Sequence, residues 1–395
     1  MIGVVEKIIN GGWGIVREKD KLIFLSYVLP KEEIEYEIKD KAKGIYWGKT
    51  LNILSPSQFR KEPKCPLYGE CGGCIFQHID YEHQKTIKTN IFKDDMQRIG
   101  GMSIDIDNFF DSPPYKYRIR GRLKAENSGK IGFIKKGTHN IIPINNCLLF
   151  SDEMNDYLTK WNSQTTPPFF FQQDILLNRN KDEKKIFSHL SHPPQKAQIE
   201  KLNKFSNLEY SWKGKDDEYV IIKTNEFAYR VKPSTFFQVN RFQHENMLNF
   251  VKENIYKSKV IIDLYSGVGF FIPLLLKYAK KVIGVESYPV SVKMAKQSFP
   301  KASFINENVD KFKFVKADII ISDPPRSGLS KHVINNIIRL KYNRLIYISC
   351  SSASFARDAK ILLNNGYSIE KISLIDLFPQ TSHIEILSVF TRNDN

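Results

Sequence analysis

The sequence predicts an α/β protein with a doubly wound sheet in its C-terminal part, a small OB-like β-barrel at its N-terminus and a β-rich part between them. From about Lys259 onward, apolar runs of strand length alternate with segments of helical periodicity, which is the pattern of an open parallel sheet with helices on both faces. Before about Gln58, five short β-like runs are separated by turn signals, which is typical of a small barrel.

These patterns divide the chain into three segments. We expect the barrel over residues 1–58, the central domain over residues 59–225 and the doubly wound domain over residues 226–395. A chain of 395 residues is long enough for two or three domains that each bury a core. The run YEHQKTIKTNIFKDDMQRI at 81–99 has helical spacing, and we expect this helix to pack on the C-terminal domain.

The composition favours an anionic partner. The chain has 59 Lys and Arg against 43 Asp and Glu, a formal charge of +16, and phosphates are the commonest partner of such an excess. Nucleic acid is therefore the leading partner, with an ordinary basic surface as the alternative. No apolar run reaches the roughly 18 residues of a membrane span. The N-terminal MIGVVEKIINGGWG lacks the pattern of a signal peptide, so we expect a cytoplasmic protein without membrane association.

One strand-like run, YKYRIRGRLK at 115–124, concentrates positive charge. With the two-residue period of a strand, one face carries five cations, namely Lys116, Arg118, Arg120, Arg122 and Lys124. Like charges in a row repel one another unless anions or carboxylates face them. We therefore expect this face to contact the RNA backbone, with a solvated face as the alternative reading.

Polar or reactive residues end four of the C-terminal strands. They are Asp263, Glu286, Asp323 and Cys350, and ligands of such sheets bind outside the carboxyl ends of the strands. This distribution is hard to explain by packing and predicts a binding site at that edge.

The turn after the first of these strands predicts the kind of cofactor. It reads DLYSGVG and supplies Gly267 and Gly269, but Phe271 stands where a dinucleotide fingerprint has its third small residue. Glu286 follows Gly267 by 19 residues, about the offset at which a carboxylate accepts ribose hydroxyls. The combination favours S-adenosylmethionine, with NAD as the alternative.

Two further residues suit covalent chemistry. Cys350 lies where a strand passes into a helix N-terminus, and the helix dipole there is expected to favour the thiolate. Glu385 lies within an apolar strand-like run after the turn FPQTSH, a costly place for a carboxylate without a role. We interpret Cys350 as a candidate nucleophile and Glu385 as a candidate general base.

The remaining cysteines form a ligand pattern. Cys65, Cys71 and Cys74 lie in CPLYGECGGC, and Cys147 is the only other cysteine before Cys350. Disulfides are rare in the cytoplasm, and zinc sites usually show two close pairs. Three close cysteines and a remote fourth better fit a cubane cluster, so we expect a [4Fe-4S] cluster on these four, with zinc as the alternative.

With these residues identified, the chain resembles the RNA (uracil-5-)-methyltransferases, which are class I S-adenosylmethionine-dependent enzymes. The matching pieces are a TRAM-like barrel, CPLYGECGGCIFQH with Cys147, FFQVN at 236–240, DLYSGVG, GVE ending at Glu286, DPPRSG at 323–328, YISCS around Cys350 and LFPQTSHIE ending at Glu385. They run nearly end to end. Tyr265 and Phe270 stand where relatives often have Phe and Asn, so the family's contact at position 270 is not carried over.

The resemblance implies a role for each matching residue. Cys350 is the nucleophile that adds to C6 of uridine, and Glu385 is the base that removes the C5 proton. The S-adenosylmethionine site is lined by Gln238, Tyr265, Glu286, Asn308 and Asp323. The RNA is contacted by Phe236, Asp323, Arg326, Arg118, Arg120 and Arg122, with Phe236 as a ring on which a flipped base stacks.

The barrel and the cysteines are more similar to the ribosomal-RNA branch of the family than to the transfer-RNA branch. The implied substrate is therefore a uridine of 23S ribosomal RNA, and the implied protein is a monomer. Transfer RNA, methylation of cytosine C5 and a non-catalytic RNA-binding or chaperone role are the alternatives that the sequence leaves open.

Overall fold

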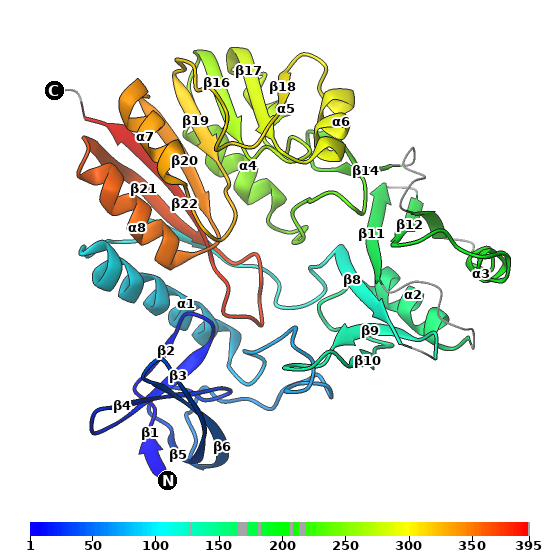
Figure 1. The fold of residues 1–395 in the computed structure, drawn as a ribbon, viewed down its shortest axis with the longest axis vertical. Coiled ribbons are helices and arrows are strands. Elements are labelled where there is room, and N and C mark those ends of the chain that lie inside the picture. Colours follow the sequence, from blue (N-terminus) through cyan, green and yellow to red (C-terminus); the bar gives the residue numbers. More distant parts are fainter. Residues whose placement is uncertain (127, 165–171, 181–182, 206–207, 213–218, 394–395) are drawn as a thin grey trace.

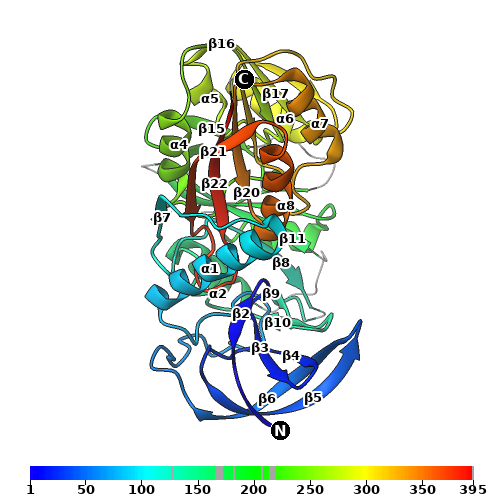
Figure 2. The same ribbon diagram turned by 90° about the vertical axis from the view of Figure 1, so that its left-hand side faces the viewer.

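The structure, a computed structural model, describes residues 1–395 except 127, 165–171, 181–182, 206–207, 213–218 and 394–395. Three groups of strands follow one another along the chain. In Figure 1 the N-terminal sheet lies at the bottom, the C-terminal sheet at the top and the central sheet at the right, with helix α1 (Tyr81–Asp95) between the first two. The turned view in Figure 2 shows the same arrangement.

The N-terminal sheet has six strands in the order β1-β5-β6-β4-β3-β2. Its strands are β1 (Ile2–Val4), β2 (Lys7–Ile9), β3 (Trp13–Glu18), β4 (Lys21–Leu25), β5 (Glu33–Ala42) and β6 (Ile45–Ser55). The first of the five β-like runs expected in this segment thus forms two strands, β1 and β2, rather than one. The chain bends at Val5, whose N–H bonds Glu32 O, while the N–H of Glu6 bonds Ile15 O on the other edge.

This bend makes the N-terminal sheet curl. Strands β1 and β2 are the two edges of the sheet, yet only Val5 and Glu6 separate them in sequence, so the two edges must come close together. The curled sheet encloses its own buried cluster, which includes Val16, Ile23 and Ile34. The OB-like assignment and the boundary at residue 58 stay predictions.

The central sheet has the order β10-β9-β8-β11-β12-β13. Its strands are β8 (Arg120–Ala125), β9 (Ile131–Ile134), β10 (Ile141–Pro143), β11 (Gln172–Asn180), β12 (Glu183–Leu190) and β13 (Leu208–Trp212). Helices α2 (Asp152–Asn162) and α3 (Lys196–Leu202) accompany it, and β14 (Val220–Lys223) and β15 (Ala228–Val231) form a separate pair. The strand expected over 115–124 begins only at Arg120, because Lys116 has a φ of 56° and interrupts the extended backbone.

The C-terminal sheet has eight strands in the order β18-β17-β16-β19-β20-β22-β21-β7. They are β7 (Asn108–Phe110), β16 (Ser258–Leu264), β17 (Ala279–Glu286), β18 (Ser303–Asn306), β19 (Ile319–Ser322), β20 (Arg344–Ser349), β21 (Tyr367–Ile375) and β22 (Glu385–Arg392). Strands β16 to β20 pair in parallel, as the alternating pattern predicts, whereas β22 runs antiparallel to both of its neighbours. The class I methyltransferase arrangement that the resemblance implies is present in this sheet.

The helices of the C-terminal part are α4 (His244–Glu253), α5 (Ile272–Leu275), α6 (Pro289–Ser298), α7 (Lys331–Leu340) and α8 (Ser352–Leu363). Helix α5 is a single turn and is the shortest of these helices. The reason is that β17 already begins at Ala279, so few residues remain for a helix after the glycine turn. Strand β7 is a further difference, because residues 108–110 come from the central segment of the sequence but extend the C-terminal sheet.

Helix α1 and the π-helical turn that continues it, η1 (Met96–Gly100), occupy the segment expected to be helical. Asp80 caps α1 by accepting the N–H of Glu82. Helix α1 and η1 both pack against α8. The Ser352 hydroxyl at the start of α8 donates to the Asp95 carboxylate. The helix therefore joins the C-terminal sheet from a distant point of the sequence.

One buried cluster runs from the central sheet into one face of the C-terminal sheet, from Ile119 to Val389, and a second fills the other face. The two sheets consequently share an apolar core. Among the residues that the structure describes, no helix combines the length and apolar character of a membrane span.

Candidate active site

The site begins at the carboxyl ends of four parallel strands. Asp263 and Glu286 lie at the ends of β16 and β17, and Asp323 and Cys350 directly follow β19 and β20. These strands are neighbours in the sheet, so the four side chains are brought to one edge, as the sequence predicts.

Strand β22 adds a fifth residue because it is antiparallel. Ser349, the last residue of β20, pairs with Ile386, and Glu385 is the first residue of β22. One residue beyond this pair, the two segments of the backbone place Cys350 and Glu385 next to each other. The end of a parallel strand and the beginning of an antiparallel strand therefore supply the two candidate catalytic groups.

Glu286, Asp323, Cys350 and Glu385 face a cavity of 1320 Å³. Every residue predicted for catalysis, for cofactor binding or for substrate binding lines it: Arg118, Arg120, Arg122, Phe236, Gln238, Tyr265, Glu286, Asn308, Asp323, Arg326, Cys350 and Glu385. The structure thus brings together residues that are up to 267 positions apart in the chain.

The thiol of Cys350 is protonated at neutral pH in this environment. Burial, followed by the negative charges of Glu385 and Asp323, raises its pKa to about 12, although the guanidinium of Arg326 opposes this shift. The thiolate that we expect from the helix N-terminus is therefore not what the free protein favours. Ser351 caps α8 and its hydroxyl accepts the N–H of Ser354, so the first turn already has an acceptor.

The two carboxylates beside the thiol also have raised pKa values. Burial raises the pKa of Asp323 to about 7, although the hydrogen bond from Gln238 Nε2 to its Oδ2, at 3.2 Å, lowers it. Burial followed by the charge of Asp323 raises the pKa of Glu385 well above its ordinary value, and Arg326 opposes this shift. Both groups are stronger bases than exposed carboxylates are.

His383 is a site residue that the sequence reading missed. It lines the cavity two residues before Glu385, and its Nε2 lies 3.0 Å from Nη2 of Arg326. Burial, followed by the charge of Arg326, lowers its pKa to about 4, so the ring is neutral and accepts the guanidinium N–H. This hydrogen bond joins the segment after β19, which contains Arg326, to the segment before β22, which contains His383, and so keeps Arg326 at the cavity. The only sequence signal was its place in the turn before Glu385.

The cofactor side of the cavity offers oxygen acceptors. The Glu286 carboxylate accepts N–H groups of Gly267 at 3.0 Å and Tyr288 at 2.6 Å, which fixes its orientation at the end of β17. Asn308 is exposed and accepts the N–H of Asp310. Oε1 of Glu286 also accepts the Ser287 hydroxyl, whereas Oε2 accepts the Gly267 N–H and retains a lone pair, which suits a ribose hydroxyl of a nucleoside.

A small cavity of 30 Å³ joins this side and contains an acceptor without a donor. Asp263 is buried, and its Oδ2 has no hydrogen-bond partner among the described residues. Gly267, Gln238 and Asp323 line the same cavity. An orphaned carboxylate oxygen is what a cationic, nucleoside-containing cofactor such as S-adenosylmethionine requires, so these residues fit that group.

The basic run lines the large cavity through its three arginines, and its side chains alternate as expected, with Tyr117, Ile119 and Leu123 buried. The charges are partly compensated. Arg120 donates to the carbonyl oxygens of Pro233 and Thr235, and Arg122 bonds Asp174 at 2.8 Å.

The side chains of Arg122 and Lys116 are 60% and 58% exposed, and each pairs with one carboxylate, Asp174 and Asp152 respectively. Of the two, Arg122 lines the large cavity, so it is the exposed cation of the run that a ligand in this cavity can reach.

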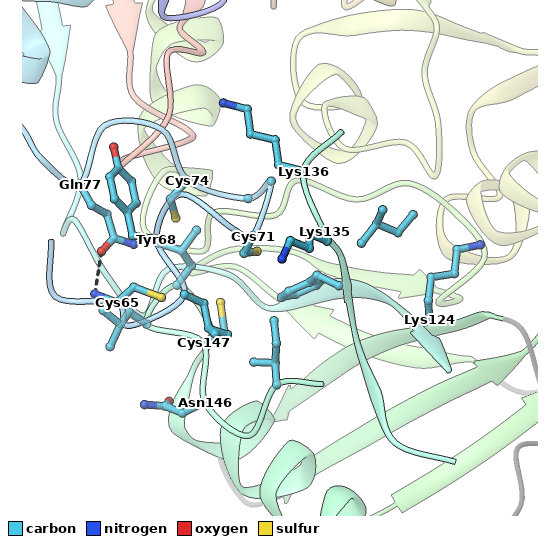
Figure 3. A pocket seen from close by; sticks show the side chains of 18 of the residues that line it. Cys65, Tyr68, Cys71, Cys74, Gln77, Lys124, Lys135, Lys136, Asn146 and Cys147 are labelled. Carbon is cyan, nitrogen blue, oxygen red and sulfur yellow. Dashed lines mark hydrogen bonds between the residues drawn. The ribbon is translucent and has the colours of Figure 1, made fainter. Parts of the chain in front are cut away.

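The four clustered cysteines line a second cavity of 520 Å³. Figure 3 shows Cys65, Cys71, Cys74 and Cys147 around one common space, and none of them forms a disulfide. Burial raises the pKa of Cys71, Cys74 and Cys147, and the positive charge of Arg118 opposes this shift. Arg118 lines both this cavity and the large one, so the two spaces are neighbours.

As the side chains stand, no set of three or more His, Cys, Asp or Glu residues in the described part of the chain is close enough to hold a metal ion. The convergence of four thiols on a single cavity nevertheless fits the donor set of a cluster larger than one ion.

The C-terminal residues 306–393 match the tRNA (Uracil-5-)-methyltransferase family. Over 99% of its length the chain is 28% identical to an RNA methyltransferase of Aquifex aeolicus, and the match covers 98% of that protein. It is also 28% identical to the 23S rRNA (uracil(1939)-C(5))-methyltransferase RlmD of Vibrio parahaemolyticus, over 98% of this chain and 95% of that one.

A solved structure has the same fold. The tRNA (uracil-54, C5)-methyltransferase of Pyrococcus abyssi, in complex with S-adenosyl-L-homocysteine, superimposes with a TM-score of 0.79 over 99% of both chains at 24% identity. This structure supports the fold, while the family match and the full-length relatives confirm the predicted resemblance to the RNA (uracil-5-)-methyltransferases.

Proposed function

We propose that this chain transfers a methyl group from S-adenosylmethionine to C5 of a uridine in RNA through a covalent adduct. The observation that carries the proposal is the adjacency of Cys350 and Glu385 in one cavity with Asp323 and Glu286. A nucleophile, a base and a nucleoside site are the groups that this reaction needs. The relatives with this chemistry in their names support the same reading.

Each group has a defined step. Bound S-adenosylmethionine supplies the methyl group as a methylsulfonium. Sγ of Cys350 adds to C6 of the uracil, which breaks the C5–C6 π bond and leaves enolate character at C5. C5 then takes the methyl group, with loss of S-adenosylhomocysteine. Glu385 removes the C5 proton, the double bond re-forms and the Sγ–C6 bond breaks, which restores the thiolate.

The thiol must lose its proton when it adds to C6. Asp323 faces it and has a raised pKa, so it can accept that proton more readily than an exposed carboxylate can, and Glu385 stays a carboxylate for the later removal of the C5 proton. The neutral His383 accepts an N–H of Arg326 and leaves the charge of Arg326 to balance the carboxylates.

The cavity is large enough for two ligands. Its 1320 Å³ exceeds the roughly 300 to 1,000 Å³ of a site for one small molecule. The ring of Phe236 is 57% exposed and lines it, so an unstacked base can lie on this ring. A uridine target must leave its stack to reach Cys350, and Arg122 at the rim can bind the adjoining phosphates.

The RNA that we propose is 23S ribosomal RNA. The full-length similarity to a ribosomal-RNA enzyme supports it, whereas the structural neighbour acts on transfer RNA and supports the fold alone. The four cysteines would hold a [4Fe-4S] cluster. Such a group would tie the loop that contains Cys65 to the central segment that contains Cys147, without a redox role in methyl transfer.

The first prediction concerns thiol activation. Iodoacetamide alkylation of Cys350, followed by peptide mass spectrometry, should become about tenfold faster per pH unit from pH 7 to 11, because the thiolate fraction rises at pH values below the pKa. Glu385→Gln removes a neighbouring negative charge and should accelerate alkylation at pH 9. A plateau near pH 8.5, the behaviour of an ordinary thiol, would contradict the raised pKa.

The second prediction separates the nucleophile from the base. Cys350→Ala should form no covalent complex with RNA and should lose activity by several orders of magnitude. Glu385→Gln should add and methylate, then accumulate a methylated adduct visible on denaturing gels. Glu370→Gln, an exposed carboxylate on β21, is the matched control and should turn over normally. Full turnover by Cys350→Ala would refute the mechanism.

The third prediction concerns the substrate. Protein-free 23S ribosomal RNA should accept labelled methyl from S-adenosylmethionine, and nuclease digestion should yield 5-methyluridine. Transfer RNA should remain unlabelled. Labelling of transfer RNA alone would overturn the ribosomal assignment but keep the chemistry, whereas 5-methylcytidine would show that the base is wrong.

The fourth prediction concerns the cysteines. Protein purified without oxygen should be brown and contain about four irons per chain, as a cubane cluster requires. Cys147→Ser should lose most of the iron, while Cys350→Ser should keep it, since Cys350 lines the other cavity. A colourless protein with stoichiometric zinc would decide for the alternative metal.

A further inference from the structure

The loop that leads into Glu385 is buried, which is unusual for a connection between two strands. This base loop, residues 376–384, joins β21 to β22 and contains Asp376, Gln380 and Ile384 at 0%, 3% and 4% exposure. Loops normally run over the surface because their backbone groups need water as a partner. The buried base loop must therefore obtain its hydrogen bonds from other parts of the protein.

Side chains from outside the C-terminal sheet supply these bonds. The amide of Asn240 donates to the carbonyl oxygens of Asp376 and Leu377 at 3.3 and 3.2 Å, and the Tyr117 hydroxyl donates to Pro379 O at 3.1 Å. In Figure 1 the red base loop extends from the sheet toward α1 and the central part of the chain.

Helix α1 contributes a fully buried ion pair. Lys88 Nζ lies 2.7 Å from Asp376 Oδ1, both side chains have no exposure, and Nζ also donates to Phe378 O at 3.1 Å. The Tyr81 hydroxyl donates to the other oxygen of Asp376 at 3.2 Å. Removing two charges from water offsets most of their attraction, so such a pair is better explained by the geometry it selects than by stability.

Helix α1 also holds the middle of the base loop through two amides. Gln84 Nε2 donates to Gln380 Oε1 at 3.1 Å, and Gln84 Oε1 accepts the N–H of Gln380 at 3.1 Å. Gln380 has a φ of 69°, a left-handed conformation that a non-glycine residue keeps only when its surroundings impose it.

The same Gln84 amide donates to Phe76 O and Ile79 O, and Gln380 O accepts the N–H groups of Ile75 and Phe76. The base loop is thereby fixed to the segment that directly follows Cys74.

We propose that Lys88 and Gln84 are positioning residues that set the place of Glu385 for removal of the C5 proton. This inference rests on the proposed function. Neither residue lines the active-site cavity, so they act through the base loop and not on the substrate. The addition of Cys350 to C6 depends on β20 instead, and should be little affected.

The test measures individual steps with Lys88→Met and Gln84→Leu. In single turnovers on 23S ribosomal RNA, the rate of methyl transfer and the KM for RNA should stay near their original values. The elimination rate should fall by roughly 10 to 100-fold, because small misplacements of a catalytic group have effects of this size. The methylated adduct should then accumulate on denaturing gels, as it does when the base itself is missing.

The controls use exposed residues of the same helical segment. Lys93→Met and Gln97→Leu make the same chemical changes on its solvent side and should leave all steps unchanged. Lys88→Met leaves Asp376 buried without a partner, so Lys88→Met with Asp376→Asn removes both charges and should show the same accumulation if it folds. Gln84→Leu changes no charge and keeps the test open if both of these variants fail to fold.

Equal losses in methyl transfer and elimination, or no accumulation of adduct in a folded Gln84→Leu protein, would overturn the proposal. The proposed function fails separately, if Glu385→Gln itself accumulates no methylated adduct.

Discussion

The antiparallel pairing of β20 with β22 is the constraint on which the candidate active site depends. A parallel strand delivers its carboxyl end to the binding edge, whereas an antiparallel strand delivers its beginning. The carboxyl end of β20 therefore meets the beginning of β22, and Cys350 and Glu385 become neighbours although 34 residues lie between them in sequence. Both strands are buried among apolar side chains, so a slip in register would move Glu385 away from the cavity and place charged groups in the core.

Much of this arrangement is predictable because it follows from local patterns. The apolar runs that end in Asp263, Glu286, Asp323 and Cys350 give the strands and their binding edge, and the basic run shows the expected alternation of buried and accessible side chains. The domain boundaries and the individual roles in catalysis stay predictions.

What the sequence does not reveal are long-range effects. The division of the first strand at Val5 results from pairing with two different edges, and the π-helical turn after α1 has no signal of its own. The raised pKa of Cys350 needs the burial and the two carboxylates that only the folded chain brings together. Lys88 looks like one more surface lysine on a helix until the position of Asp376 is known.

The large cavity carries groups of both charges in a protein whose formal charge is +16. Glu286 and Asp323 line it at the ends of β17 and β19, and Arg118, Arg120 and Arg122 of the basic run line it as well. A cationic sulfonium is attracted to the carboxylate of Glu286, and a phosphate is attracted to the arginines. One cavity thus offers complementary charge to two ligands of opposite charge.

The pair formed by Lys88 and Asp376 also has a consequence for the growing chain, because 288 residues separate the two partners. At roughly 5 to 20 residues per second, synthesis of that stretch takes roughly 15 to 60 seconds. During this time Ile87 and Ile91 of α1 can pack with Ile8 and Leu29 of the N-terminal part, but Lys88 has no counter-charge and the face that packs on α8 is uncovered. The N-terminal sheet can form early, but this second face of the helix must wait for nearly the last residues to emerge. A ribosome that stops shortly before the end would release a chain whose first two sheets are complete and whose helix α1 keeps one face exposed to chaperones and proteases.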